Sequence, residues 1–133
     1  IKQAVKIPVL YNGDVVDGES AKAALAATGC DGVMIGRGAQ GSPWVFAEVA
    51  AVMQGEAPPP VPTLREVCSV MDEQVRGMCE EMGEDIAMRV ARGVAIAYMR
   101  GLRGAAALRR EACGLTIYTD LGRLIESAYE YNS

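Results

Sequence analysis

Histidine is absent from this chain of 133 residues. Its absence removes the commonest general base, so Ser-His and Cys-His catalysis cannot be built from these residues alone. Four cysteines are present, but they form no Cys-x-x-Cys pair, and without histidine they cannot complete a zinc site. We therefore expect no metal site, and reduced, buried thiols at Cys30, Cys68, Cys79 and Cys113. Any chemistry must come from a cofactor or from residues elsewhere.

Long apolar runs are also missing. No stretch approaches the roughly 18 to 20 apolar residues of a membrane span, and the first residues lack the pattern of a signal peptide. No repeat of 20 to 50 residues is present, which excludes a solenoid. Half of the residues are apolar, enough to bury a core. We expect a globular, cytoplasmic protein of one domain or two small ones, with no membrane partner.

Acidic residues are absent from one long segment, residues 89–110. The net charge is −4, which by itself argues against a nucleic-acid partner. Residues 66–85 carry seven acids and one arginine, whereas residues 89–110 carry six arginines and no acid. The local sign of the charge therefore matters more than the total.

The first half predicts a βαβ unit. An apolar run at residues 7–10 favours a buried parallel strand, and the polar residues after it favour a turn. Good helix formers follow at residues 19–28, with Gly29 at the position of a left-handed C-cap. A second apolar run at residues 32–35 ends in Gly36-Arg37-Gly38. The two strands should be parallel.

A second helix and a proline-rich segment close this half. Ser42 is expected to cap the helix, with Pro43 at its first position, and Gly55 is expected to end it. The proline-rich residues 57–62 favour an extended, semi-rigid linker. We therefore expect one domain at residues 1–56, the linker at 57–62, and a second domain at 63–133.

The second half predicts a helical bundle. Thr63 to Glu66 matches a capping box before a helix that ends near Met82. Further helices are expected over residues 84–99, 105–113 and 120–131. In the helix at 84–99 the residues expected to face inward are Ile86, Val90, Val94 and Ala97.

The two predicted strands end in residues that suit an anion. Glycines let backbone amides approach a phosphate, and Arg37 supplies a positive charge. In (β/α)₈ barrels a phosphate site is frequently formed by the loops after strands seven and eight. A tight turn and an ordinary glycine loop explain the same residues, so the pattern alone leaves both interpretations open.

Two segments resemble the end of the barrel in the tRNA-dihydrouridine synthases. They are IPVLYNGDV at residues 7–15 and TGCDGVMIGRGAQGSPWVF at residues 28–46. The resemblance implies an α/β barrel fragment, the last two βα units of a TIM barrel, followed by an all-α helical bundle domain. It also implies an FMN site, mainly for the phosphate, at Asn12, Gly13, Asp14, Gly36 and Arg37. The whole enzyme would reduce uridine in tRNA to 5,6-dihydrouridine, with NADPH recharging the flavin.

The resemblance extends to RVAR at residues 89–92 and YMRGL at residues 98–102, which are similar to the family's helical tRNA-binding domain. On an ideal helix the residues expected to bind RNA fall within an arc of about 80°; they are Arg89, Arg92, Arg100 and Arg103. The chain departs from the family in having Gly93-Val94 in place of the usual Lys-His, and Ala97 in place of an aromatic residue. Without the resemblance, a solvated face paired with acids of the preceding helix would be favoured.

The family's catalytic cysteine lies earlier in the barrel, and none of the four cysteines here sits in its motif. We therefore assign no catalytic residue and expect the chain to be part of a longer protein and inactive alone. Its exposed strand edges should pair with another copy or pack against its own helices. The alternatives are another FMN-dependent TIM-barrel oxidoreductase, such as a dihydroorotate- or glycolate-oxidising type, and a non-enzymatic helical interaction module.

Overall fold

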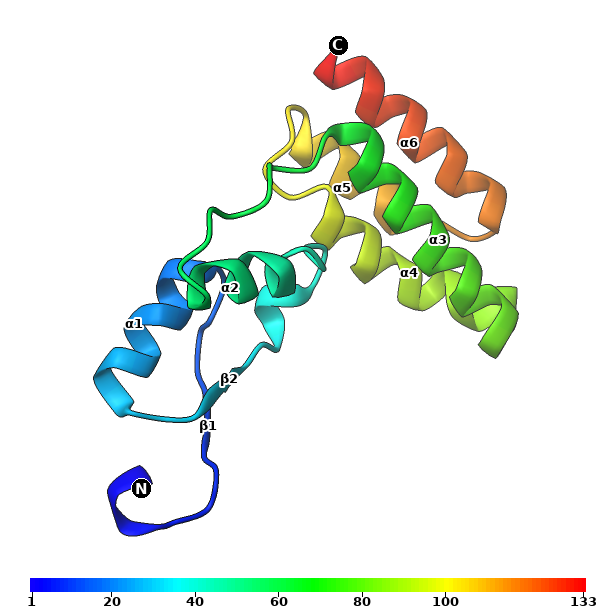
Figure 1. Ribbon diagram of the computed structural model, residues 1–133. Helices are drawn as coiled ribbons and strands as arrows, with labels where there is room; N and C mark the ends of the chain where they lie inside the picture. The colour runs from blue at the N-terminus through cyan, green and yellow to red at the C-terminus, as the bar shows by residue number, and fades with distance from the viewer. The chain divides into compact units, whose positions relative to one another are not determined.

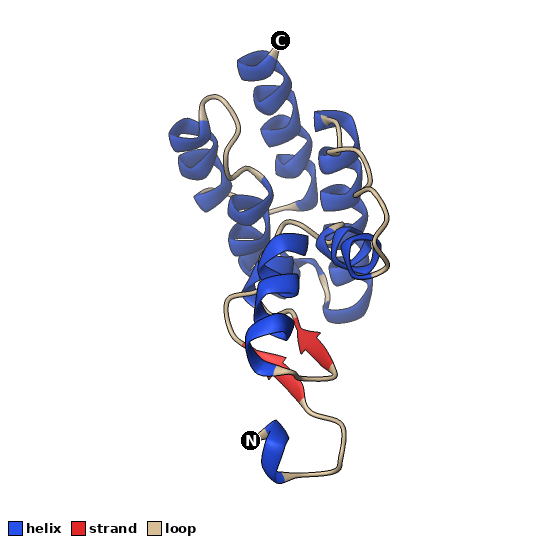
Figure 2. Ribbon diagram, turned by 60° about the vertical axis from the view of Figure 1, so that its left-hand side comes forward, coloured by secondary structure: helices blue, strands red, loops and turns tan.

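The computed structural model describes residues 1–133, which form two compact units, Ile1–Val61 and Pro62–Ser133. The chain is mostly helical and has two short parallel strands, both in the N-terminal unit (Figures 1 and 2). A 3₁₀ helix, η1, at Lys2–Ala4 precedes the first strand. No helix combines the length and the apolar character that crossing a bilayer requires.

The strands are β1 at Leu10–Asn12 and β2 at Gly32–Met34, and they pair in parallel as predicted. The position predicted for the first strand, residues 7–10, is wrong. Val9, just before the strand, is bonded to Asp31 instead of to a paired strand residue. The Val9 N–H donates to the Asp31 carboxylate at 2.7 Å, and the Asp31 N–H donates to the Val9 carbonyl at 2.8 Å. Tyr11 and Asn12, predicted to lie in the turn, are therefore strand residues.

Helix α1 spans Gly18–Thr28 and is capped at both ends by local chemistry. The Asp17 carboxylate accepts from the Ser20 N–H, and the Ser20 hydroxyl oxygen accepts from the Asp17 N–H. The hydrogen bonds from Ser20 lower the pKa of Asp17 below its ordinary value. At the other end Gly29 has φ = 66°, which confirms the predicted left-handed C-cap.

Helix α2 spans Val45–Met53 and begins later than predicted. Trp44 is the N-cap, and no side chain caps this helix, so the expected roles of Ser42 and Pro43 are wrong. Ser42 contributes its carbonyl, which accepts from the Val45 N–H at 3.1 Å. Residues 42 and 43 therefore belong to the turn that enters the helix.

The two faces of the sheet differ. Tyr11 and Val33, paired across the strands, pack on a buried cluster contributed by the following loop, α1 and α2: Val15, Ala21, Val45 and Val49. Neighbouring residues in a strand point to opposite faces, so Leu10 and Met34 lie on the other face. Their exposed fractions are 60% and 53%. One face is thus covered by helices, and the other is open.

The C-terminal unit consists of α3 at Leu64–Met82, α4 at Glu84–Tyr98, α5 at Ala105–Cys113 and α6 at Tyr118–Asn132. Helix α3 packs on α4 and α6, and α5 packs on the same two helices, so the four enclose one core. The predicted capping box of α3 is confirmed: the Glu66 N–H donates to the Thr63 hydroxyl, and the Glu66 carboxylate accepts from the Thr63 N–H. The Thr63 N–H and the Thr63 hydroxyl both donate to the Glu66 carboxylate, and these two hydrogen bonds lower its pKa.

The inward face predicted for α4 is wrong. Ile86 and Val90 are 57% and 50% exposed, whereas the buried residues of this helix are Ala87, Met88, Ala91, Ala95 and Tyr98. Helix α4 packs against both α3 and α5, and alanines let helix backbones approach closely. The other two predicted residues, Val94 and Ala97, are half-buried, so hydrophobicity alone selected a face beside the buried one.

Candidate functional site

The carboxyl ends of the two parallel strands bring the predicted anion-binding residues together. Asn12 ends β1, and Gly36 and Arg37 follow β2 after one further residue. Arg37 Nη2 lies 2.9 Å from Asp14 Oδ1, and both side chains are more than four-fifths exposed. An ion pair this exposed adds little stability. It shows, however, that the two loops meet at one place.

A second contact joins the same loops at their backbones. The 3₁₀ helix η2 spans Arg37–Ala39, and a Cβ added at Gly38 would lie 2.3 Å from the carbonyl oxygen of Val15. Val15 is buried in the core of this unit. Only glycine therefore permits the observed packing of η2 on the loop after β1. From the sequence, Gly38 was predicted to be a turn residue and was not included in the site. The Gly36-Arg37-Gly38 pattern was the signal that could have indicated it.

The turn after β1 is compact. Asp14 has φ = 41°, the single positive value among residues other than glycine. This conformation is uncommon for an L residue, although aspartate tolerates it better than most. A Cβ added at Gly13 would lie 2.8 Å from the Tyr11 hydroxyl oxygen. The Asn12-Gly13-Asp14 sequence thus sets a tight turn that directs Asp14 toward Arg37.

The residues present fit a phosphate group. Nothing lies within 4 Å of a Cβ added at Gly36, so there is room beside the backbone at that position. The ion pair with Asp14 uses Nη2 of Arg37, and a guanidinium has further N–H donors on its other nitrogens. The negative charge of the Asp14 carboxylate would repel a phosphate bound here. The phosphate and the carboxylate would both contact the Arg37 guanidinium.

The four arginines predicted to bind RNA all lie in the C-terminal unit, but not on one helix. Arg89 and Arg92 belong to α4, which ends at Tyr98. Arg100 and Arg103 lie in the turn before α5, where Gly101 and Gly104 have φ values of 82° and 74°. The expectation of one continuous helical face is wrong, because the two left-handed glycines turn the chain away from the helix axis.

The side chain of Arg92 makes a hydrogen bond, whereas no side-chain hydrogen bond is made by the other three. Its Nε donates to the Leu115 carbonyl at 2.9 Å, and its side chain is half-buried. Arg89, Arg100 and Arg103 are exposed. None of the three ion pairs in the structure includes an arginine between residues 89 and 110. The acids of α3 therefore do not neutralise this segment through direct ion pairs.

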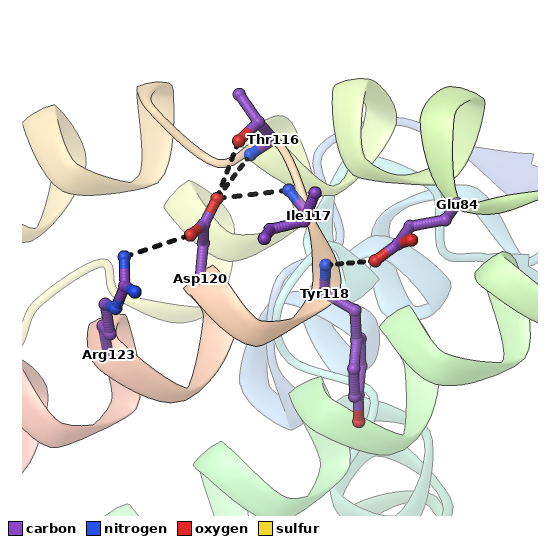
Figure 3. A network of polar contacts seen from close by, with 6 residues as sticks. All are labelled: Glu84, Thr116, Ile117, Tyr118, Asp120 and Arg123. Carbon is purple, nitrogen blue, oxygen red and sulfur yellow. Dashed lines mark hydrogen bonds and ion pairs between the residues drawn. The ribbon is translucent and has the colours of Figure 1, made fainter.

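The loop that holds Arg92 is itself anchored (Figure 3). One oxygen of the Asp120 carboxylate accepts from the Thr116 N–H, the Thr116 hydroxyl and the Ile117 N–H at 2.9, 2.9 and 3.1 Å. The Tyr118 N–H donates to Glu84 Oε1 at 2.6 Å, which ties the loop to the start of α4. The backbone donors at Thr116 and Ile117 lower the pKa of Asp120. Arg92 therefore contacts a loop with a defined conformation.

Comparisons with known proteins identify the family. The family model described as "Dihydrouridine synthase (Dus)" matches residues 1–129. The chain belongs to the dihydrouridine synthase family. A protein of Mycobacterium tuberculosis strain H37Rv named "Probable tRNA-dihydrouridine synthase" is 40% identical over 127 residues, which are 95% of this chain and 33% of the relative.

Two further relatives agree. A protein of Mycobacterium leprae with the same name is 44% identical over 110 residues, 82% of this chain and 29% of the relative. The protein of Pseudomonas putida named tRNA-dihydrouridine synthase B is 42% identical over 92 residues, 69% of this chain and 27% of the relative. The chain therefore spans about a third or less of the length of these dihydrouridine synthases.

The match to the dihydrouridine synthase family covers both candidate regions. It includes the loops at Asp14 and Arg37 and the segment from Arg89 to Arg103. Tyr131 and Asn132, at the end of α6, lie beyond the matched residues. Their contacts are therefore known from the structure and not from the family comparison.

Proposed function

We propose that this chain is the part of a tRNA-dihydrouridine synthase that binds the FMN phosphate and docks tRNA. The whole protein would reduce a uridine of tRNA to 5,6-dihydrouridine with NADPH as the reductant. FMN, when bound, supplies the hydride for this reduction. The catalytic acid would come from outside this chain. The observation that supports the proposal is the meeting of the two strand-end loops through Arg37 and Asp14 and through Gly38 and Val15.

The fold proposed for the N-terminal unit is the last two βα units of a TIM barrel. Residues 1–56 would form this part, residues 57–62 a linker, and residues 63–133 the tRNA-binding domain. The covered and open faces of the sheet support this assignment, because barrel strands have helices outside and side chains inside. Asn12, paired with Met34, lies on the open face, on the side expected for the barrel interior.

The proposed phosphate group would be held by residues of both loops. The backbone at Gly13 and Gly36 would approach it, and the Arg37 guanidinium would donate to its oxygens. Asn12 and Asp14 would line the first loop. Asp14 would also keep the guanidinium at the mouth of the site through the contact at 2.9 Å.

The FMN proposal is tested in the whole protein that carries this chain. FMN released from the purified protein is quantified, and its affinity is measured by titration of the apoprotein. Arg37→Ala should reduce the affinity at least about tenfold, because charge-assisted hydrogen bonds to phosphate are strong. Lys22→Ala removes an exposed cation of α1 and is the matched control. Equal affinity in both variants would contradict the proposed role of Arg37.

The proposed tRNA surface consists of Arg89, Arg92, Arg100 and Arg103. Arginine suits phosphate contacts because its fork can bind two oxygens together. Three of these side chains are exposed and outside any ion pair, which leaves them accessible to RNA. Arg92 would contribute mainly by holding α4 to the loop at Leu115.

Filter binding of transcribed tRNA to this chain, at two salt concentrations, tests the surface. The triple variant Arg89→Ala, Arg100→Ala, Arg103→Ala should bind more weakly, and its salt slope should shrink by about one for each phosphate that the variant no longer neutralises. The control triple variant removes three exposed arginines of α3 and α6: Arg65→Ala, Arg76→Ala and Arg123→Ala. If the two triple variants behave alike, only total charge matters and the surface is not specific.

The sheet also supports self-association of the isolated chain. Its two strands pair only with each other, which leaves both outer edges without a strand partner. Exposed edges with apolar residues such as Leu10 and Met34 favour pairing with another copy. Sedimentation should show association that rises with concentration and weakens in Leu10→Lys. A monomer at all concentrations would contradict this proposal.

A further inference from the structure

The turn between α4 and α5 presents two of the proposed RNA-binding arginines. We define this arginine turn as residues 99–104. It begins at Met99, which is 1% exposed, and it contains the left-handed glycines 101 and 104. Between these points the side chains of Arg100 and Arg103 are exposed. Short turns rich in glycine are flexible unless other residues hold them.

Asn132, the last residue of α6, holds the backbone of this turn. The Arg103 N–H donates to Asn132 Oδ1 at 3.0 Å, and Asn132 Nδ2 donates to the Arg103 carbonyl at 3.3 Å. The same Nδ2 donates to the Ala128 carbonyl at 2.8 Å within α6. A carboxamide offers a donor and an acceptor together, so it can satisfy both backbone groups of one residue.

Tyr131 holds the next part of the turn. A Cβ added at Gly104 would lie 2.5, 2.7 and 2.8 Å from Cγ, Cδ1 and Cδ2 of the Tyr131 ring. The backbone of Gly104 therefore lies directly against the ring, nearest to the ring carbon that is bonded to Cβ. Its φ of 74° also favours glycine. Gly104 is thus required both by the conformation of the turn and by its contact with α6.

We propose that Tyr131 and Asn132 are positioning residues for the proposed tRNA surface. They fix the arginine turn on the end of α6, so that Arg100 and Arg103 are in place before RNA arrives. This inference rests on the proposed tRNA docking and adds residues that the family match does not include. Its physical basis is preorganisation: a turn that is already ordered loses less conformational entropy on binding.

The test measures tRNA affinity of this chain by filter binding at two salt concentrations, together with thermal unfolding by circular dichroism. Asn132→Ala should weaken binding about fivefold to tenfold with little change in helical content. Ser133→Ala is the matched control, because the Ser133 hydroxyl also donates to a carbonyl near the end of α6, that of Tyr129, but does not contact the turn. The control should bind like the unsubstituted chain.

A double-mutant cycle separates positioning from general stability. In the background Arg100→Ala, Arg103→Ala, adding Asn132→Ala should change affinity no further, because the cations it positions are gone. Tyr131→Ala should behave like Asn132→Ala, and Tyr131→Phe, which keeps the ring, should restore binding. Because Tyr131 and Asn132 are substituted separately, either one can test the positioning role if the variant at the other is less stable.

The outcomes distinguish the two proposals. If Arg100→Ala, Arg103→Ala weakens binding but Asn132→Ala and Tyr131→Ala do not, the positioning role is wrong and the docking role stands. An equal loss from Asn132→Ala in both backgrounds also contradicts positioning. If the unsubstituted chain shows no salt-dependent tRNA binding, the docking role fails, and the positioning role fails with it.

Discussion

The two units of this chain differ in how much apolar side chain they bury. The C-terminal unit encloses its core with four helices, and each helix contributes side chains that are almost fully buried. The N-terminal unit buries only a small cluster between its sheet and two helices, and it leaves the other face of the sheet open. Because stability follows apolar area removed from water, the N-terminal unit should depend on further contacts and the C-terminal unit should not.

The difference also separates the two candidate regions. The proposed phosphate site depends on the close approach of two backbone loops in the unit with the small core. The proposed tRNA surface uses exposed side chains on the unit with the large core. Exposed side chains on a rigid scaffold can vary, apart from positions such as Gly104 that hold a turn, whereas a site formed by loop packing depends on glycines such as Gly38.

The largest effect is expected from shortening a core side chain of the C-terminal unit. Leu121 is fully buried, so Leu121→Ala should lower the free energy of unfolding of this unit by about 3 kcal/mol. Leu10→Ala, on the open face of the sheet, should change the free energy of unfolding of its own unit by less than about 0.5 kcal/mol at concentrations where the chain is a monomer. Urea titrations followed by circular dichroism measure both. Comparable losses would mean that the open face is buried in solution.

A smaller loss is expected when Gly38→Ala separates the two loops of the N-terminal unit. The new methyl group would meet the Val15 carbonyl, and overpacking of this kind costs about 2 kcal/mol. Trp44 is the only tryptophan of the chain and lies in this unit, so its fluorescence reports the unfolding of these residues. An unchanged midpoint would show that the loops do not pack as described.

A glycine-to-alanine substitution in the C-terminal unit should have the opposite effect on the free energy of unfolding. Gly93 lies inside α4, and nothing lies within 4 Å of a Cβ added there. Gly93→Ala should raise the free energy of unfolding by about 1 kcal/mol, because alanine has the higher helix propensity. Thermal unfolding by circular dichroism measures the gain. A decrease would indicate that this face of α4 is covered in solution.

The smallest change in stability is expected on lowering the pH. The pKa values of Asp17 in the N-terminal unit and Asp120 in the C-terminal unit are both lowered by hydrogen bonds to the folded-state carboxylate. A lowered folded pKa stabilises the fold above the ordinary value of 3.8, and this contribution disappears as pH falls through the folded value. Helix α1 and the start of α6 should therefore weaken in acid.

Substitution separates the two carboxylates. Asp120→Asn should reduce the acid dependence of the circular dichroism midpoint below about pH 5, and Asp17→Asn should reduce that of Trp44 fluorescence. Part of the dependence should persist, because Glu66 and Asp31 also have lowered pKa values. Each variant should leave the other signal unchanged. A shift in both signals from one substitution would show that the units unfold together.

The sequence alone determined the features that depend on neighbours along the chain. The capping box at Thr63 and the left-handed Gly29 were predicted because a cap is satisfied within a few residues. The family was also recognisable from the residues around the two strand ends, and the comparison with known dihydrouridine synthases confirmed it.

Only the tertiary structure decided which groups meet across the chain. The inward face of α4 depends on how closely α3 and α5 approach, which hydrophobicity does not encode. The roles of Gly38 and Asn132 depend on backbone atoms from distant segments, Val15 and Arg103. Contacts of this kind leave no local pattern, because their partners are brought together by folding and not by spacing in the sequence.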